Sequence, residues 1–278
     1  MTPVAIAVAI QGEAGSFSHA AAREALGPDV QLVPCPTFED LFRAVEAGQA
    51  ARGVVPIENS LAGSVYEAYD ALGAHALHVV AETQVHVRHC LVVRPGTKLA
   101  AVRRVASHPV ALAQCRRFFA EHPGVAPVPA YDTAGSVRDL MADHLAAEAA
   151  IGSSLAAHLY GAEVLLEGLE DHPENYTRFL VVAREPAPAG QASKTSLVLT
   201  LPDVPGSLHQ ALGVFAGRQV NLSKIESRPI PGRPWEYVFY LDVMGDSRSG
   251  VAAALTELGA LAKDLRVLGA YPARALPS

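Results

Sequence analysis

The chain has 278 residues, of which 50% are hydrophobic and 18% are charged, with a net charge of −6 at pH 7. This balance predicts a compact globular protein of about two domains and excludes a broad nucleic-acid-binding surface, which needs clustered Lys and Arg. The widely separated Cys35, Cys90 and Cys115 form neither a disulfide framework nor a Cys-x-x-Cys metal site, so we expect a reducing compartment.

The first apolar stretch, Val4 to Ile10, stops at Gly12 and predicts a β-strand. It lacks the basic flank of a signal peptide, and no run approaches the roughly 18 apolar residues of a membrane span. We therefore expect a cytoplasmic protein with no membrane partner.

The N-terminal two thirds of the chain alternate apolar strands with Ala-rich helices. The predicted pairs are a strand over 4–10 with a helix over 20–26, a strand over 53–56 with a helix over 65–72, and a strand over 102–106 with a helix over 112–121. Such alternation indicates an α/β fold with largely parallel sheets.

A Pro- and Gly-containing linker over 184–194 separates two strongly apolar strands and marks a domain boundary. Beyond it the pattern is a strand over 195–201, a helix around Leu208 to Phe215, a strand over 220–228, a turn over 231–234, a strand over 235–243, a helix over 251–261 and a strand near Val267. This β-α-β-β-α-β order predicts a ferredoxin-like domain.

Hydroxyl and amide side chains recur where strands or loops are expected to turn into helices: Ser16, Ser18, Asn59, Ser60, Ser107, Thr133, Ser136, Ser153 and Ser154. Each one alone is a typical helix cap. Together they predict several helix N-termini at the carboxyl edges of strands, where free N–H groups attract anions. We therefore expect a cleft that binds a small carboxylate.

Thr177 and Arg178 directly precede an apolar strand over 179–183, a position where active sites form. Arginine matches a carboxylate, and threonine offers one hydroxyl proton. The nearest metal-binding pattern is His86, His89 and Cys90, but on a strand His86 and His89 point to opposite faces, so we expect no metal. His108, beside Ser107, is the histidine best placed to face a ligand, although a structural role is the more common one for such a residue.

Five segments in order, GEAGSFSHAAA, VVPIENSLAGSV, SHPVALAQC, AAIGSSLAAHLYG and NYTRFLVV, resemble the prephenate dehydratase family. The segment DVPGSLHQALGVFAGRQVNLSKIESRP resembles the ACT regulatory domain that follows the catalytic part in that family. The resemblance implies a two-lobed catalytic domain similar to type II periplasmic binding proteins over 1–184 and an ACT domain over 194–272.

The resemblance also implies the reaction: prephenate loses water and carbon dioxide to give phenylpyruvate, in L-phenylalanine biosynthesis, without metal or organic cofactor. Thr177 would act on the leaving hydroxyl, either by transferring a proton or by hydrogen bonding to it. The catalytic residues implied are Thr177, Glu58, Asn59, Ser60 and Arg178. The substrate-binding candidates are Ser16, Ser107, Thr133, Ser153, Asn175 and Phe179.

Prephenate is thus the expected substrate and L-phenylalanine the expected effector, bound between the ACT domains of two subunits in a homodimer or homotetramer. The residues implied for the effector site are Gly206, Ser207, Leu208, His209, Asn221, Leu222, Glu226, Ser227, Arg228 and Pro229. Here Gly206-Ser207-Leu208-His209 replaces the Gly-Ala-Leu motif usual in the family, which leaves the effector open.

Two other functions agree with the sequence. The chain could be a sensor that binds a carboxylate without turnover, although Thr177 and Glu58 in matching motifs favour catalysis. It could also prefer arogenate, which carries an amino group where prephenate has a keto oxygen.

Overall fold

The computed structural model describes residues 6–188, 190, 192–230, 232–245 and 250–274. The chain forms two compact units, one of residues 1–65 and 83–179, the other of residues 66–82 and 180–278. Residues 4 and 5 of the predicted first strand and Pro231 of the predicted turn lie outside the described residues.

The first sheet has the strand order β2-β1-β3-β11-β5, and β4 pairs with β3. Its strands are β1 (Ala7–Gln11), β2 (Gln31–Cys35), β3 (Arg52–Asn59), β4 (Gly63–Ser64), β5 (His78–His86) and β11 (Tyr176–Ala183). β1 runs parallel to both β2 and β3. Two helices belong to this lobe, α1 (Phe17–Leu26) and α2 (Phe38–Glu46), and α2 buries Leu41, Phe42 and Val45 completely.

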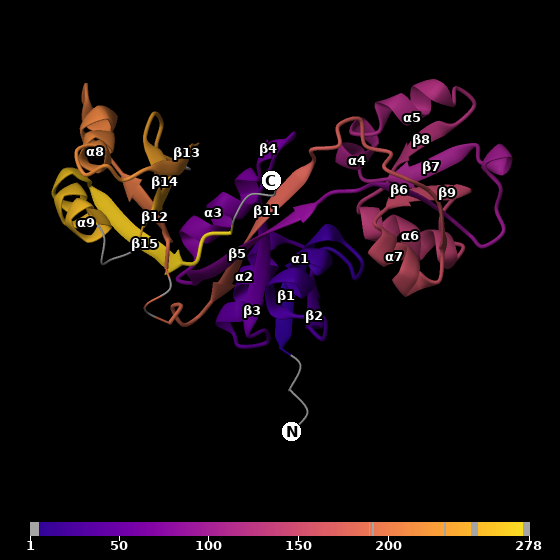
Figure 1. Cartoon of the computed structure of the whole chain (residues 1–278), viewed down its shortest axis with the longest axis horizontal. Helices are drawn as coiled ribbons and strands as arrows, with labels where there is room; N and C mark the ends of the chain where they lie inside the picture. The colour runs from indigo at the N-terminus through magenta and orange to yellow at the C-terminus, as the bar shows by residue number, and fades with distance from the viewer. Residues whose placement is uncertain (1–5, 189, 191, 231, 246–249, 275–278) are drawn as a thin grey trace. The chain divides into compact units, whose positions relative to one another are not determined.

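The second sheet has the order β10-β6-β9-β7-β8, and Figure 1 labels its strands β6 to β9. Its strands are β6 (Cys90–Val93), β7 (Arg104–Ser107), β8 (Ala126–Pro129), β9 (Ala149–Gly152) and β10 (Glu163–Glu167). The helices of this lobe are α4 (Pro109–Ala113), α5 (Arg116–Glu121), α6 (Thr133–Met141) and α7 (Ser154–Tyr160), with a 3₁₀ turn at Leu99–Ala101.

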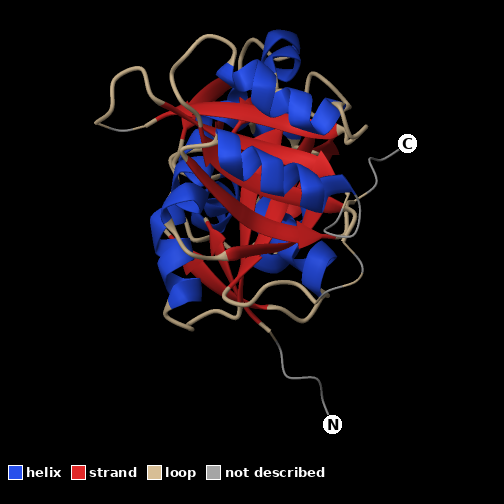
Figure 2. Cartoon of the chain, turned by 90° about the vertical axis from the view of Figure 1, so that its left-hand side faces the viewer, coloured by secondary structure: helices blue, strands red, loops and turns tan. Residues whose placement is uncertain are grey.

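β7 is parallel to β8 and β9, whereas β6 is antiparallel to β9 and β10. Helices and strands are both abundant along the chain (Figure 2), and separate apolar clusters pack around Leu91 and Ile151 and around Val92 and Ala150. The prediction of an α/β fold is therefore confirmed, but the sheets are mixed rather than largely parallel, because β4 and β6 pair with their neighbours in the antiparallel sense.

The second unit contains a sheet of order β13-β14-β12-β15, in which every pair is antiparallel. Its elements are β12 (Lys194–Thr200), α8 (Ser207–Ala216), β13 (Leu222–Pro229), β14 (Tyr237–Met244), α9 (Gly250–Leu261) and β15 (Asp264–Tyr271). α8 and α9 cover one face of the sheet (Figure 1) around Leu197, Phe215 and Leu258. The predicted β-α-β-β-α-β order is confirmed.

Helix α3 (Tyr66–Ala74) also belongs to the second unit, where it is bonded to side chains of β14 and β15. The Tyr240 hydroxyl donates to the Tyr69 carbonyl oxygen at 2.8 Å. The Arg266 guanidinium donates to the carbonyl oxygens of Leu72 and Gly73, at 2.8 and 3.0 Å. The last carbonyls of α3, which have no partner within the helix, are thus satisfied by a cation, the favourable charge at this end.

Lys194, at the start of β12, makes a buried ion pair with Glu82 of β5, with its Nζ 2.6 and 2.9 Å from the two carboxylate oxygens. The Arg274 N–H donates to the same carboxylate at 2.8 Å. The Lys194 ammonium and the Arg274 N–H together offset the hydration that the Glu82 carboxylate loses on burial. No helix of the described residues is long and apolar enough to cross a membrane.

Candidate active site

Asn59 and Ser60 form the turn that joins β3 to β4. The Asn59 Oδ1 accepts hydrogen bonds from the backbone N–H groups of Leu61 and Ala62, at 3.0 and 2.8 Å, an asparagine turn. The prediction that Asn59 and Ser60 start a helix is therefore wrong, because the asparagine side chain bends the chain back into a hairpin and α3 begins only at Tyr66.

Ser60 joins this turn to the segment that leads into β11. Its hydroxyl donates to the Glu174 carbonyl at 2.9 Å and accepts from the Tyr176 N–H at 2.9 Å. Its own N–H donates to the Tyr176 carbonyl at 2.8 Å. The structure thus brings together two segments that lie more than a hundred residues apart in the sequence.

The Asn59 amide group is bonded directly to Thr177. Its Nδ2 donates to the Thr177 Oγ1 at 2.9 Å, to the Asn175 Oδ1 at 2.8 Å and to the Tyr176 carbonyl at 3.2 Å. Because the Thr177 oxygen accepts this bond, its hydroxyl proton is left to point elsewhere. Thr177 is 9% exposed, so the bond to Asn59 is little weakened by competing water.

Two further side chains extend this cluster inward, and the sequence interpretation did not assign them to the site. The Asn175 Nδ2 donates to the Gln114 Oε1 at 3.1 Å, and the same oxygen lies 2.9 Å from the His89 Nε2. Asn175 is fully buried and His89 is 2% exposed. Gln114 lies in the segment SHPVALAQC, whose resemblance to the family was the available signal.

Glu58, Arg178 and Phe179 lie close in sequence to the residues of this cluster, but the structure places them differently. Glu58 is half-buried and pairs with Ser64 across the β3–β4 hairpin. Arg178 is half-buried and follows Thr177 on β11, so the alternation of a strand puts it on the opposite face. Phe179 is 1% exposed and lies in the core.

Ser16 and Ser153 cap two helices whose first turns meet. Ser16 accepts from the His19 N–H at the start of α1, and Ser153 accepts from the Ala156 N–H at the start of α7. The Ser153 hydroxyl also donates to the Gly15 carbonyl at 2.5 Å. A Cβ on Gly15, whose φ is +88°, would lie 2.6 Å from the Ala156 Cα. Only glycine therefore allows this close approach.

The other predicted caps differ in part. Ser107 ends β7, and its hydroxyl donates to the Ile151 carbonyl at 2.7 Å. The cap of α4 is His108, whose Nδ1 accepts from the Val110 N–H. Helix α6 is capped by Asp132, which accepts from the Gly135 N–H at 2.7 Å, so the prediction of Thr133 and Ser136 as caps is wrong. Burial raises the pKa of the Asp132 carboxyl, and hydrogen bonds from Gly135 and Ala134 oppose this shift.

Ser18 and Ser154 also do not act as caps. Ser18 lies within the first turn of α1, where Ser16 is the cap, and Ser154 is the first residue of α7, where Ser153 is the cap. The capping prediction is therefore confirmed for Ser16 and Ser153 and wrong for Ser18 and Ser154.

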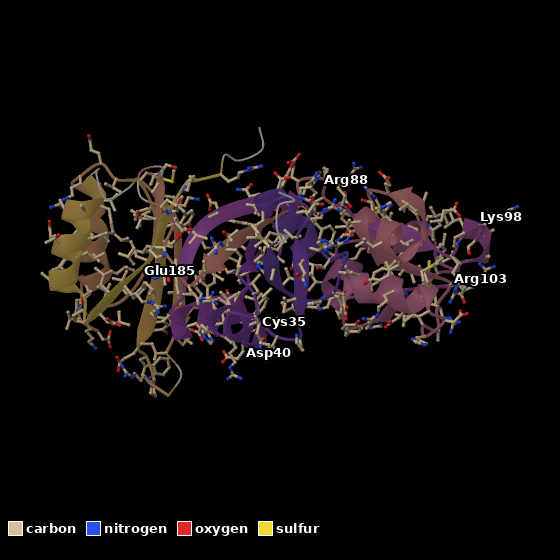
Figure 3. All side chains as sticks on the ribbon, turned by 90° about the horizontal axis from the view of Figure 1, so that it is seen from below. Cys35, Asp40, Arg88, Lys98, Arg103 and Glu185 are labelled. Carbon is tan, nitrogen blue, oxygen red and sulfur yellow. The ribbon has the colours of Figure 1, made fainter. Side chains whose placement is uncertain are left out.

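The histidines weighed as metal ligands have separate partners. The His86 Nε2 lies 2.6 Å from the Pro173 carbonyl, and its ring stacks on Tyr176, whereas His89 bonds to Gln114. No group of three or more His, Cys, Asp or Glu side chains is placed to hold a metal within the part of the chain that the structure describes. The basic residues of this unit labelled in Figure 3 are dispersed, with Arg88 well apart from Lys98 and Arg103.

The residues implied for the effector site lie on α8 and β13 of the second unit. Gly206 caps α8 with a φ of 88°. Ser207 and Leu208 line a cavity of about 140 Å³ whose other walls include Val204, Trp235 and Phe239. His209 is exposed in the first turn of α8.

Along β13, alternate residues face opposite sides of the sheet. Ser227 pairs with Phe239, which packs on the α8–α9 side, whereas Glu226 and Arg228 pair with Tyr240 and Val238 and belong to the other face. Asn221 precedes this strand, and Leu222 and Pro229 are its first and last residues.

Comparison with known proteins identifies the chain. A family model described as prephenate dehydratase matches residues 8–187, and one described as ACT domain matches residues 195–260. The chain is 42% identical over 279 residues to arogenate dehydratase/prephenate dehydratase 2, chloroplastic, of Arabidopsis thaliana, covering 96% of this chain and 73% of that relative.

The chain belongs to the prephenate dehydratase family.

Two solved structures are similar to this chain. The prephenate dehydratase of Arthrobacter aurescens in complex with L-Phe is 38% identical, with a TM-score of 0.88, and the match covers 96% of this chain and 90% of that one. A structure described as GqqA, a novel type of quorum quenching acylase, is 37% identical with a TM-score of 0.88, covering 96% and 98% of the two chains.

Membership of the prephenate dehydratase family assigns the reaction class: a carbon–oxygen lyase that dehydrates prephenate in L-phenylalanine biosynthesis and carries an ACT regulatory domain.

Proposed function

We propose that Thr177 is the hydrogen-bond donor to the departing hydroxyl as prephenate loses water and carbon dioxide to give phenylpyruvate. The observation that carries the proposal is the bond from the Asn59 Nδ2 to the Thr177 Oγ1 at 2.9 Å. Since an amide N–H can only donate, the threonine oxygen accepts, and its hydroxyl proton is directed away from Asn59.

The reaction needs few further groups from the protein. Loss of the ring carboxylate and the 4-hydroxyl creates an aromatic ring, so much of the driving force lies in the substrate. A threonine hydroxyl is a weak acid and acts best by hydrogen bonding to the negative charge that develops on the leaving oxygen. One such donor contributes on the order of 3 kcal/mol, about a hundredfold in rate.

The surrounding residues take supporting roles in this proposal. Ser60 and Asn175 fix the Asn59 turn against β11. Glu58 and Arg178 orient the site, Arg178 from the face of β11 opposite Thr177. The adjoining helix starts at Ser16 and Ser153 offer N–H groups to a substrate carboxylate, and Ser107 and Thr133 complete the pocket.

For regulation we propose a catalytic domain over 1–184 and an ACT domain over 194–272 that binds L-phenylalanine and thereby inhibits the enzyme. The cavity beside Ser207 and Leu208 combines the apolar side chains of Val204, Trp235 and Phe239 with the polar ones of Asp203 and Glu236, a mixture that suits an amino acid with an aromatic side chain. A relative of 38% identity is described as binding L-Phe.

We propose a homodimer or homotetramer. Its pairing surface includes the apolar side chains exposed on the ACT domain, among them Trp235 at 80% and Ile225 at 46%. Aromatic side chains such as Trp235 are enriched at protein–protein interfaces.

Acyl hydrolysis is a second candidate because a similar solved structure is described as an acylase. A hydroxyl nucleophile needs a neighbouring base to take its proton. Among the described residues, the hydrogen-bond partner of the Thr177 Oγ1 is the amide nitrogen of Asn59, which is no base. The geometry therefore favours dehydration.

The test is phenylpyruvate formation from prephenate by the wild-type chain, Thr177→Ser and Thr177→Ala, without added metal. We expect turnover to fall about a hundredfold in Thr177→Ala and to be largely retained in Thr177→Ser, which keeps the hydroxyl. Equal turnover by wild type and Thr177→Ala would remove the donor role.

Parallel assays with arogenate and with an acyl amide decide between the substrates. Binding of prephenate by the wild-type chain without any turnover would instead favour a sensor. Saturating phenylalanine that changes neither activity nor thermal stability would exclude it as the effector.

A further inference from the structure

A line of amide groups leads from the β3–β4 turn to His89, and each group can be oriented in only one way. The starting point is the turn itself. The backbone N–H groups of Leu61 and Ala62 can only donate, so the oxygen of the Asn59 amide must face them. Its nitrogen therefore faces Thr177 and Asn175.

This orientation sets the next two amides. The Asn175 oxygen accepts from the Asn59 nitrogen at 2.8 Å, so its own nitrogen faces Gln114. The Gln114 oxygen must then face Asn175, at 3.1 Å, because two amide nitrogens would repel each other.

The line ends on the imidazole of His89. The Gln114 oxygen that accepts from Asn175 also lies 2.9 Å from the His89 Nε2. A carbonyl oxygen cannot donate, so the His89 Nε2 carries the proton. The ring holds the tautomer in which Nδ1 has no hydrogen.

His89 is fixed in place by its own backbone. Its N–H donates to the Glu170 Oε2 at 2.7 Å, and its carbonyl accepts from the Leu169 N–H at 3.0 Å. The ring meets the edge of Phe17 at 5.6 Å between centroids. Among the described residues the buried Nδ1 has no hydrogen-bond partner.

The buried surroundings of the His89 ring favour its neutral form. A second proton would place an N–H on Nδ1 where no described residue accepts it. Burial lowers the pKa of His89, and Gln114 and Glu170 oppose this shift in part.

We propose that His89 is a positioning residue for the dehydration: its Nε2–H orients Gln114, which orients Asn175 and Asn59 and so keeps the Thr177 hydroxyl as a donor to the substrate. This inference rests on the proposed role of Thr177. His89 lies at the far end of the line and acts only through the amides between them.

Two substitutions test the proposal. His89→Gln keeps an N–H donor near the place of Nε2, and His89→Leu removes it. We expect His89→Leu to lower kcat for prephenate between about tenfold and a hundredfold with little change in KM, since small displacements of a reacting group have costs of this size. His89→Gln should recover most of the loss.

His122→Gln and His122→Leu are the matched controls. The His122 Nδ1 lies 2.8 Å from the Phe118 carbonyl in the same lobe, away from the amide line. Both controls should keep wild-type kcat. Equal kcat in His89→Leu and wild type, or equal losses in His89→Gln and His89→Leu, would overturn the proposal. If His89→Leu does not fold, His89→Asn replaces it, because its shorter amide does not reach Gln114.

A direct readout comes from the ¹⁵N spectrum of the whole protein labelled at histidine, with His89 assigned by the loss of its signals in His89→Gln. The expected result is a neutral ring with the proton on Nε2 at pH 7. A proton on Nδ1, alone or on a cationic ring, would overturn the assigned orientation.

The two proposals fail in different ways. Wild-type turnover in Thr177→Ala removes the donor role itself, whatever His89 does. A large loss of turnover in Thr177→Ala together with a wild-type kcat in His89→Leu would contradict only the positioning role of His89. If both hold, the double variant His89→Leu/Thr177→Ala should be no slower than Thr177→Ala, because both substitutions act on one hydroxyl.

Discussion

Arg228 holds the Asp70 carboxylate by two hydrogen bonds, from Nε to Oδ1 at 3.0 Å and from Nη2 to Oδ2 at 2.7 Å. The guanidinium carbon also lies 4.4 Å from the centre of the Tyr66 ring. Arg228 belongs to the ESRP segment of β13, and Asp70 and Tyr66 belong to α3. Helix α3 begins directly after the β3–β4 hairpin that carries Asn59, so Arg228 contacts the helix that follows the candidate site turn along the chain.

Asp70→Asn should weaken the effect of phenylalanine on turnover. The substitution removes the charge that Arg228 holds, and we expect the phenylalanine concentration for half-maximal inhibition to rise about fivefold, or about 1 kcal/mol of coupling. Because Asp70 is about half exposed, at 47%, the loss of stability should stay below about 1 kcal/mol. Inhibition curves of the two proteins are the measurement.

The control is Glu257→Gln, which breaks the 2.6 Å ion pair with Arg218 elsewhere in the second unit. Its inhibition curve should match that of the wild-type protein. Superimposable curves for Asp70→Asn and wild type would show that the Arg228 contact does not transmit the effector signal.

Asn59→Asp should reverse the direction of the bond to Thr177. One oxygen of the introduced carboxylate can still accept from Leu61 and Ala62, but the other cannot donate, so the Thr177 hydroxyl would turn its proton toward that oxygen and away from the substrate. We expect kcat to fall about a hundredfold, as for Thr177→Ala. Steady-state kinetics with prephenate measure this.

Leu61→Ala changes the same turn without altering a side-chain hydrogen bond, and its kcat should remain near that of the wild type. A kcat in Asn59→Asp close to the wild-type value would contradict the assigned polarity of the Asn59–Thr177 bond.

Gly73→Ala should destabilise the protein, and Tyr240→Phe should relieve the effect. A Cβ on Gly73 would lie within 2.2 Å of the Tyr240 hydroxyl oxygen, so this ring must move and lose its bond to the Tyr69 carbonyl. Overpacking of this kind costs roughly 1–3 kcal/mol. Urea unfolding of the two single variants and the double variant measures the coupling free energy between the two substitutions.

The double variant should be more stable than Gly73→Ala alone, because phenylalanine lacks the clashing oxygen. Additive losses in the double variant would mean that the alanine is accommodated without disturbing Tyr240.

The buried thiols predict a loss of stability at alkaline pH. Burial raises the pKa of Cys115 to about 12 and that of Cys90 to about 11, from an ordinary value of 9.0. Their stabilising contribution is complete below pH 9 and is lost as the pH rises toward these folded values, because thiols of the unfolded chain ionise first.

Each thiol can add a slope of up to about 1.4 kcal/mol per pH unit in that window. The free energy of unfolding, measured in urea between pH 8 and 10.5, should therefore fall less steeply in Cys115→Ala than in the wild type. Parallel slopes would contradict the raised pKa.

The ACT domain was the part best predicted from sequence, because each of its strands and helices shows the hydrophobic periodicity of its own secondary structure. The spacing of Leu208, Ala211 and Phe215 and the run from Tyr237 to Met244 are local signals that the sheet then satisfies. By contrast, β2 and α2 were not predicted. β2 contains Pro34, which interrupts a strand pattern and is tolerated because β2 is an edge strand.

The residues of the candidate site were each named from the sequence, but the hydrogen bonds between them were not predicted. Thr177 and Asn59 lie 118 residues apart, and nothing in the local pattern around either one shows which atom faces the other. Capping was predicted correctly at Ser16 and Ser153 and incorrectly at Thr133, because the neighbouring Asp132 competes for the same N–H groups. Gln114 and His89 have no distinctive spacing, and only folding brings them behind Asn175.

Helix α3 has a practical implication for anyone who wants a feedback-insensitive enzyme. Truncating the protein at the linker over 184–194 would remove Tyr240, Arg266 and Arg228, which donate hydrogen bonds to this helix. It would also remove Lys194, which pairs with Glu82. The shortened protein would expose apolar surface and a carboxylate that has lost its lysine, and it should aggregate or be digested faster than the full chain. Desensitised variants are therefore better sought by replacing single side chains around the α8 cavity, where the neighbours of α3 stay in place.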